Sequence, residues 1–85
     1  MFDESRLRRA GQRAKVRLGP QQCSVAGKSE TLYYVDLTQH PPCTCADAHY
    51  RERDCLHTLA CRMLCGDVDV LVAYGELLQR DGAET

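Results

Sequence analysis

The sequence predicts a small α+β domain, a metal-stapled ββα module with a basic helix before it and an additional helix after it. Strand-like segments fill residues 15–37, and helical patterns begin at residue 56. Between them stand two close pairs of potential metal ligands, Cys43 with Cys45 and Cys55 with His57. The chain has 85 residues, no tryptophan and one phenylalanine. Few bulky side chains can therefore fill its core, and a bound ion would add stability.

The first element expected is a basic helix in residues 1–14. Leu7, Ala10 and Ala14 recur at helical spacing, and Asp3 is placed to cap the first turn. Gly11 weakens this helix, so the sequence leaves its length open.

Three segments between this helix and the first ligand pair have the pattern of strands. They are residues 15–18, 22–25 and 31–37. Gly19 and Pro20 interrupt the pattern after the first segment, and the third is rich in β-branched and aromatic residues. Turn-forming residues at 27–29 predict a hairpin between the second and third segments.

Two helices are expected after the second ligand pair. A helical pattern over residues 56–65 places that pair at its first turn, and Gly66 is a suitable terminator. Asp67 can cap a second helix, which Gly82 would end. The apolar face expected on this second helix consists of Val70, Leu71, Tyr74, Leu77 and Leu78.

The two ligand pairs predict one structural zinc ion. Thiolate and imidazole are the ligands that structural zinc takes, with four protein ligands and no open position. The nine residues between the pairs are enough to carry the chain around an ion. The expected metal ligands are Cys43, Cys45, Cys55 and His57.

Six cysteines could instead indicate a secreted disulfide scaffold. Cys43 and Cys45 are poorly placed to bridge each other, and His57 adds a ligand that disulfide chemistry does not use. The first residues lack the apolar stretch of a signal peptide, and no apolar run is long enough to span a bilayer. We therefore expect a reducing, intracellular location (cytoplasmic, or nuclear in a eukaryote) and no membrane partner.

The other potential ligands are interpreted first as ordinary side chains. His40 and His49 flank the ligand pairs and could replace a ligand, but exposed loop histidines are commoner. Cys61 and Cys65 follow His57 on one helical stripe, which makes a second or shared metal site conceivable. No fourth ligand is evident, so packing as small apolar side chains is the simpler interpretation for these two cysteines. Cys23, within its strand, is interpreted likewise.

Basic residues concentrate at the beginning of the chain. Residues 1–17 hold six basic and two acidic side chains, a balance of +4, whereas residues 18–85 hold five basic and ten acidic ones. This segment could contact phosphate, or it could be a solvated helix face. The candidate nucleic-acid contacts are Arg6, Arg8, Arg9, Arg13, Lys15 and Arg17, with Arg51 and Arg53 between the ligand pairs.

The order of these parts resembles the SWIM zinc finger, whose pattern is CxCx(n)CxH. The resemblance extends beyond the ligands, over about residues 15–65. Its matching runs are LYYVDL (32–37), CTCAD (43–47) and CLHTLA (55–60), with Leu56 where a lysine is common. The resemblance implies a zinc-organised ββα module that binds DNA or other proteins. It divides the chain into a basic helical segment (1–14), a SWIM-like finger (15–65), and a C-terminal helix and tail (66–85).

Two function classes remain at this stage. The chain could be a stand-alone binding module that contacts nucleic acid through phosphates, or a protein-interaction adaptor that uses the metal loop or the last helix. An enzyme is not expected, because four protein ligands close the metal shell and the deaminase pattern of H-x-E before P-C-x-x-C is absent. No small-molecule substrate is expected either. The clustered charge favours nucleic acid by a small margin.

Overall fold

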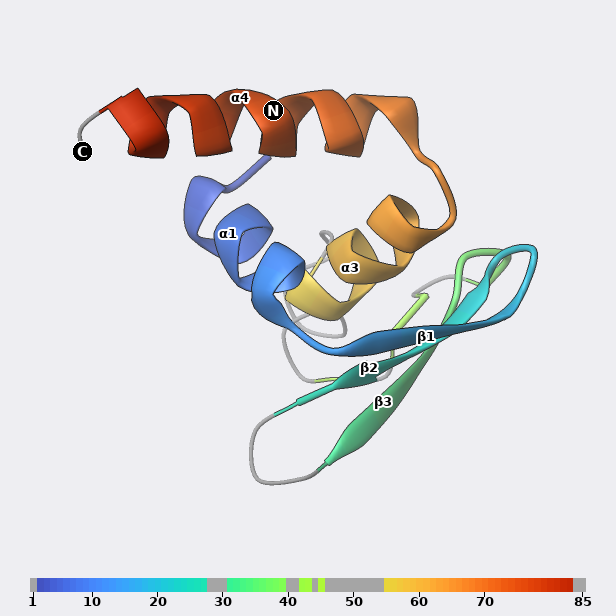
Figure 1. Ribbon diagram of the computed structural model, residues 1–85. Helices are drawn as coiled ribbons and strands as arrows, with labels where there is room; N and C mark the ends of the chain where they lie inside the picture. The colour runs from blue at the N-terminus through green and yellow to red at the C-terminus, as the bar shows by residue number, and fades with distance from the viewer. Residues whose placement is uncertain (1, 28–30, 40–41, 44, 46–54, 84–85) are drawn as a thin grey trace.

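The computed structural model describes residues 2–27, 31–39, 42–43, 45 and 55–83. The three strands form one antiparallel sheet in the order β1-β2-β3, so the fold class is α+β, as the sequence predicts. α3 packs on the sheet and also contacts α1 and α4, which makes it the central element (Figure 1). The elements are α1 (Glu4–Gln12), β1 (Lys15–Gly19), β2 (Gln22–Ala26), β3 (Leu32–Asp36), α3 (Leu56–Leu64) and α4 (Val68–Ala83).

The sheet has one buried and one exposed face. In the central strand, Cys23 pairs with Arg17 of β1 and with Val35 of β3. The side chains of Cys23, Val25 and Val35 are buried on the face that α3 covers. Side chains alternate along a strand, so the neighbouring positions point to the other face. Four large apolar side chains there are more than half exposed: Val16, Leu18, Leu32 and Tyr34.

α1 begins and ends with side-chain caps. The Asp3 carboxylate accepts a hydrogen bond of 3.0 Å from the Arg6 backbone N–H, which confirms the predicted cap. Leu7 and Ala10 are buried, as their spacing predicts, whereas Ala14 lies beyond the end of α1 and is exposed. At the other end, the Lys15 ammonium donates to backbone carbonyls of the last helical turn, including that of Ala10 at 3.1 Å. Because these carbonyls carry the negative end of the helix dipole, Lys15 stabilises the end of α1.

The turn between α3 and α4 follows the predicted signals. Gly66 adopts a φ of 85°, the left-handed conformation that ends a helix. Asp67 accepts a hydrogen bond of 3.3 Å from the Val70 N–H and pairs with Arg62 at 2.7 Å. Gly82 does not end α4, which continues to Ala83. None of the described helices is both long and apolar enough to cross a membrane.

The predicted apolar face of α4 is divided in the structure. Val70 and Leu77 are buried in the core, and Tyr74 is half-buried. Leu71 and Leu78 remain about half exposed, at 46% and 51%. The inner part of this face therefore attaches α4 to the domain, and only its outer part is available to a partner.

Gly11 is the position where α4 approaches α1. A Cβ at residue 11 would overlap the outer end of the Tyr74 ring, whereas a Cβ at Gly75 in α4 would meet nothing within 4 Å. Gly11→Ala should force the half-buried Tyr74 ring to move, so we expect the lost packing to offset the gain of about 0.5–1 kcal/mol in helix propensity and to leave no net stabilisation. Gly75→Ala, the matched control, should stabilise it by about 0.5–1 kcal/mol. Urea unfolding would measure both, and a stabilised Gly11→Ala protein would contradict the close contact.

Candidate metal centre

All four predicted metal ligands converge in the structure. The ligand atoms of the Cys/His cluster, Cys43, Cys45, Cys55 and His57, all lie within 4.8 Å of one another. The Cys43 and Cys55 sulfurs are each 3.8 Å from Nδ1 of His57. Cys43 and Cys55 are almost fully buried, and Cys45 and His57 are each 8% exposed. A buried set of three thiols and one imidazole around a common point could hold a metal ion.

Each half of the cluster is attached to a different part of the fold. Cys43 forms an isolated antiparallel bridge with Val35, and the Asp36 N–H donates to the Pro42 carbonyl at 3.0 Å, so the first pair is fixed to β3. Cys55 is the N-cap residue of α3, and His57 lies in its first turn. An ion held by both pairs would therefore connect the edge of the sheet to the central helix.

Neighbouring side chains orient the ligands. The Tyr33 ring stacks on the His57 imidazole, with centroids 4.2 Å apart and an interplanar angle of 28°. Thr58 places its hydroxyl 3.4 Å from the Cys55 sulfur. Such contacts outside the ligand shell fix ring orientation and tune the affinity of metal sites. Tyr33 belongs to the tyrosine-rich strand before the first pair, and the structure gives that residue a position directly over a ligand.

The electrostatics of the cluster favour one thiolate even without an ion. The hydrogen bond from Cys43 lowers the pKa of the Cys55 thiol, and contacts with His57 and Thr58 lower it further, whereas burial opposes this shift. The same thiol–thiol contact raises the pKa of Cys43, and burial raises it further. A metal ion would displace the protons of these thiols because metals bind the thiolate.

A second group of cysteines converges where the C-terminal part of α3 meets β2. The three-cysteine cluster consists of Cys23 from β2 and Cys61 and Cys65 from α3 and its C-cap, with all three sulfurs within 4.8 Å. The sequence shows Cys61 and Cys65 one helical turn apart, but Cys23 is 38 residues earlier, and no local pattern indicates that it joins them. The sequence therefore predicts Cys23 as a small apolar side chain of the core, without the two cysteines that the structure places beside it.

Several predicted nucleic-acid contacts are engaged within the domain. Arg6 pairs with the carboxylate of Asp3 at 3.0 Å. Arg8 makes two hydrogen bonds of 3.1 Å to Asp81, which join α1 to α4. Lys15, at the end of α1, is half-buried, and burial lowers its pKa. These three cations have intramolecular roles that their sequence positions did not indicate.

Other cations of the basic segment are less constrained. Arg9 is exposed and Arg13 is half-buried, and neither forms an ion pair within the described part of the chain. Arg17 is exposed and donates to the backbone carbonyls of Gly19 and Pro20, at 3.1 and 3.3 Å. Arg9 and Arg13 are therefore cations of this segment that no ion pair within the described residues engages.

The remaining candidates of the sequence analysis lie outside the described residues. They are His40 and His49 as alternative ligands and Arg51 and Arg53 as phosphate contacts.

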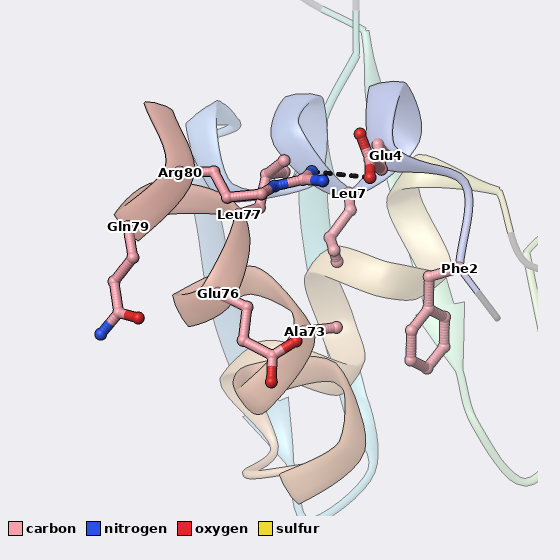
Figure 2. Close-up of a pocket in the computed structure, with 8 residues that line it drawn as sticks. All are labelled: Phe2, Glu4, Leu7, Ala73, Glu76, Leu77, Gln79 and Arg80. Carbon is pink, nitrogen blue, oxygen red and sulfur yellow. Dashed lines mark ion pairs between the residues drawn. The ribbon is translucent and has the colours of Figure 1, made fainter. Parts of the chain in front are cut away.

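A pocket separate from both cysteine clusters lies between α1 and α4 (Figure 2). Leu7 and Leu77 contribute apolar lining, and Arg80 pairs with Glu4 at 2.6 Å across the two helices. Both charged side chains are about 60% exposed, so this pair contributes little to stability. The lining includes no cysteine or histidine, and the pocket forms part of the α1–α4 contact.

Comparisons of this chain with protein-family models, with curated proteins and with solved structures found no match, so the Cys/His cluster itself carries the functional argument.

Proposed function

We propose that this chain is a structural zinc-binding module of the SWIM type that binds a macromolecular partner. The convergence of Cys43, Cys45, Cys55 and His57 within 4.8 Å carries the proposal. For metal–sulfur and metal–nitrogen bonds of about 2.3 and 2.0 Å, tetrahedral geometry separates sulfur from nitrogen by about 3.5 Å. The two sulfur–nitrogen distances of 3.8 Å are close to this value. The ligand set favours zinc and supplies all four positions, which suits a structural rather than a catalytic ion.

The order of elements also supports the SWIM assignment. The tyrosine-containing strand β3 precedes the first ligand pair, and the second pair opens a helix that packs on the sheet. In the SWIM interpretation, the ion joins the hairpin to the following helix. The bridge between Cys43 and Val35 and the position of Cys55 at the start of α3 fit this role.

Nucleic acid is the first partner class to test. Arg9, Arg13 and Arg17 belong to the +4 segment at the start of the chain, and they extend from α1 into β1. Arg9 and Arg13 form no ion pair within the described residues, so phosphate contacts there would not require breaking one. Such contacts bind nucleic acid without reading its sequence. The expected binding is therefore modest in affinity and poorly selective.

Arg9→Ala and Arg13→Ala should each weaken binding to duplex DNA or RNA and flatten the salt dependence of the binding constant by about one unit, since each lost phosphate contact releases one fewer condensed counterion. The double variant should lose about two units. Arg80→Ala in α4 removes the same charge outside the basic segment and should leave the slope unchanged. Fluorescence anisotropy across a salt series would measure this, with circular dichroism to confirm the fold.

A zinc-loaded chain that retains neither DNA nor RNA at low salt would contradict the nucleic-acid proposal. An adaptor function would then be favoured by a specific observation, the four apolar side chains on the open face of the sheet. Val16, Leu18, Leu32 and Tyr34 are 56–66% exposed. Large exposed apolar groups gathered on one face are typical of interaction surfaces.

A further inference from the structure

The sulfurs of the three-cysteine cluster are spaced as metal ligands are. The Cys65 sulfur lies 3.7 Å from that of Cys23 and 4.0 Å from that of Cys61. With metal–sulfur bonds of about 2.3 Å, two thiolates on one ion are separated by about 3.8 Å in tetrahedral geometry and about 4.0 Å in trigonal geometry. Two of the three sulfur–sulfur separations therefore match those of thiolates on one ion, and the third, between Cys23 and Cys61, is at most 4.8 Å.

The sulfurs are carried by the central strand and the central helix of the domain. Cys23 and Cys61 are fully buried, one in the central strand and the other in the central helix. Cys65 is the C-cap residue of α3 and is only half-buried, so it offers a route by which an ion can enter. Sites built on helices and strands hold their ligands more precisely than sites on loops.

A redox switch would use the same cysteines but fits them poorly. Burial is the main cause that raises the pKa of Cys23 and of Cys61. Redox-sensing thiols are instead exposed and have lowered pKa values, because the thiolate is the reactive form. A metal ion can still bind buried thiols, since it supplies the charge that stabilises the thiolates when they release their protons to water.

We propose that Cys23, Cys61 and Cys65 form a second metal site, specific for a soft monovalent ion of the copper(I) class. All-thiolate ligand sets select soft ions, and zinc prefers four ligands. Within the described residues, no imidazole or carboxylate joins the three sulfurs. Three sulfurs can complete the coordination of copper(I). The site is independent of the zinc that we assign to the Cys/His cluster.

The charge near the cluster fits this assignment. Three thiolates around a monovalent ion carry a net charge of −2, which is costly to bury without compensation. Arg17 is the direct cross-strand partner of Cys23. Burial raises the pKa of the Cys23 thiol overall, and the positive charge of Arg17 opposes this as the smallest of the influences. The guanidinium would therefore offset a small part of the negative charge.

The test is an anaerobic titration of the zinc-loaded chain with copper(I) buffered by a chromogenic chelator, while released zinc is measured. The first equivalent of copper(I) should bind without releasing zinc. Cys65→Ser should weaken this binding at least about 100-fold, because even changes outside the ligand shell of metal sites cost about 10–100-fold. Met63→Leu, which removes a non-ligand sulfur from the same helix, should leave the affinity unchanged.

Several outcomes would overturn the second site. Release of one zinc by the first equivalent would show that copper(I) takes the Cys/His cluster instead. Equal affinity in Cys65→Ser, or two zinc ions per chain in the purified protein, would contradict the assignment as well. X-ray absorption on the copper-loaded wild-type chain does not depend on a variant folding. It should show three sulfur neighbours, and a nitrogen neighbour would place the ion on His57.

Discussion

Removing zinc with a chelator should unfold α3 and, with it, most of the domain. α3 contacts all three strands and both other helices, and the proposed ion fixes its first turn to the edge of the sheet. Structural zinc contributes about 10–16 kcal/mol of apparent binding free energy in zinc-finger peptides, which is comparable to the total stability of about 5–15 kcal/mol typical of native proteins. Far-UV circular dichroism should therefore show loss of most helical signal at 25 °C.

The control is restoration of the signal by one equivalent of zinc, which separates metal loss from irreversible damage by the chelator. Elemental analysis must confirm that the chelated sample is free of metal. If that metal-free chain keeps the circular dichroism spectrum and the thermal midpoint of the zinc-loaded one, the ion does not hold the fold together. The core formed by residues such as Leu59 and Val25 would then be sufficient alone.

The elements of this fold were predictable because their signals are local. Asp3 caps α1 with its own side chain, and Gly66 and Asp67 form the turn between the last two helices within a few residues of one another. The Cys/His cluster was equally predictable. Each ligand pair spans three residues, and the nine residues between the pairs have only to bring the second pair back to the first. Local chemistry in these places determines local structure.

Side-chain partners that depend on packing were not predictable. Arg8 was expected on a phosphate-binding face, but it bonds to Asp81, 73 residues away, because α1 and α4 pack against each other. The three-cysteine cluster depends in the same way on α3 lying across β2. Periodicity indicates which face of an element is buried, but it does not indicate which other element covers that face.

Gly11 is unfavourable for the helix that contains it but favourable for the packing of that helix against α4. Its low helix propensity left the length of the first helix open, and the structure extends that helix one residue past it, to Gln12. The missing Cβ makes room for the Tyr74 ring, so the local cost permits a tertiary contact. The Tyr74 ring of α4 therefore favours glycine at this position of α1.

Replacing a single zinc ligand should have an effect almost as large as chelation. In Cys45→Ser, a hydroxyl takes the place of a thiol that is 8% exposed, and neutral oxygen is a poor ligand for zinc at that position. Three ligands would remain, and the fourth position would open to water. We expect the purified variant to have lost most of its zinc and to melt well below the wild-type chain.

Cys65→Ser provides the matched control, because it makes the same chemical change at a cysteine outside the Cys/His cluster. This variant should retain one zinc per chain with wild-type affinity, measured by competition with a chromogenic zinc chelator. The pair of variants tests whether zinc is held by the four assigned ligands or is shared among all six cysteines. If Cys45→Ser keeps a full equivalent of zinc, or Cys65→Ser loses it, the ion does not belong to Cys43, Cys45, Cys55 and His57.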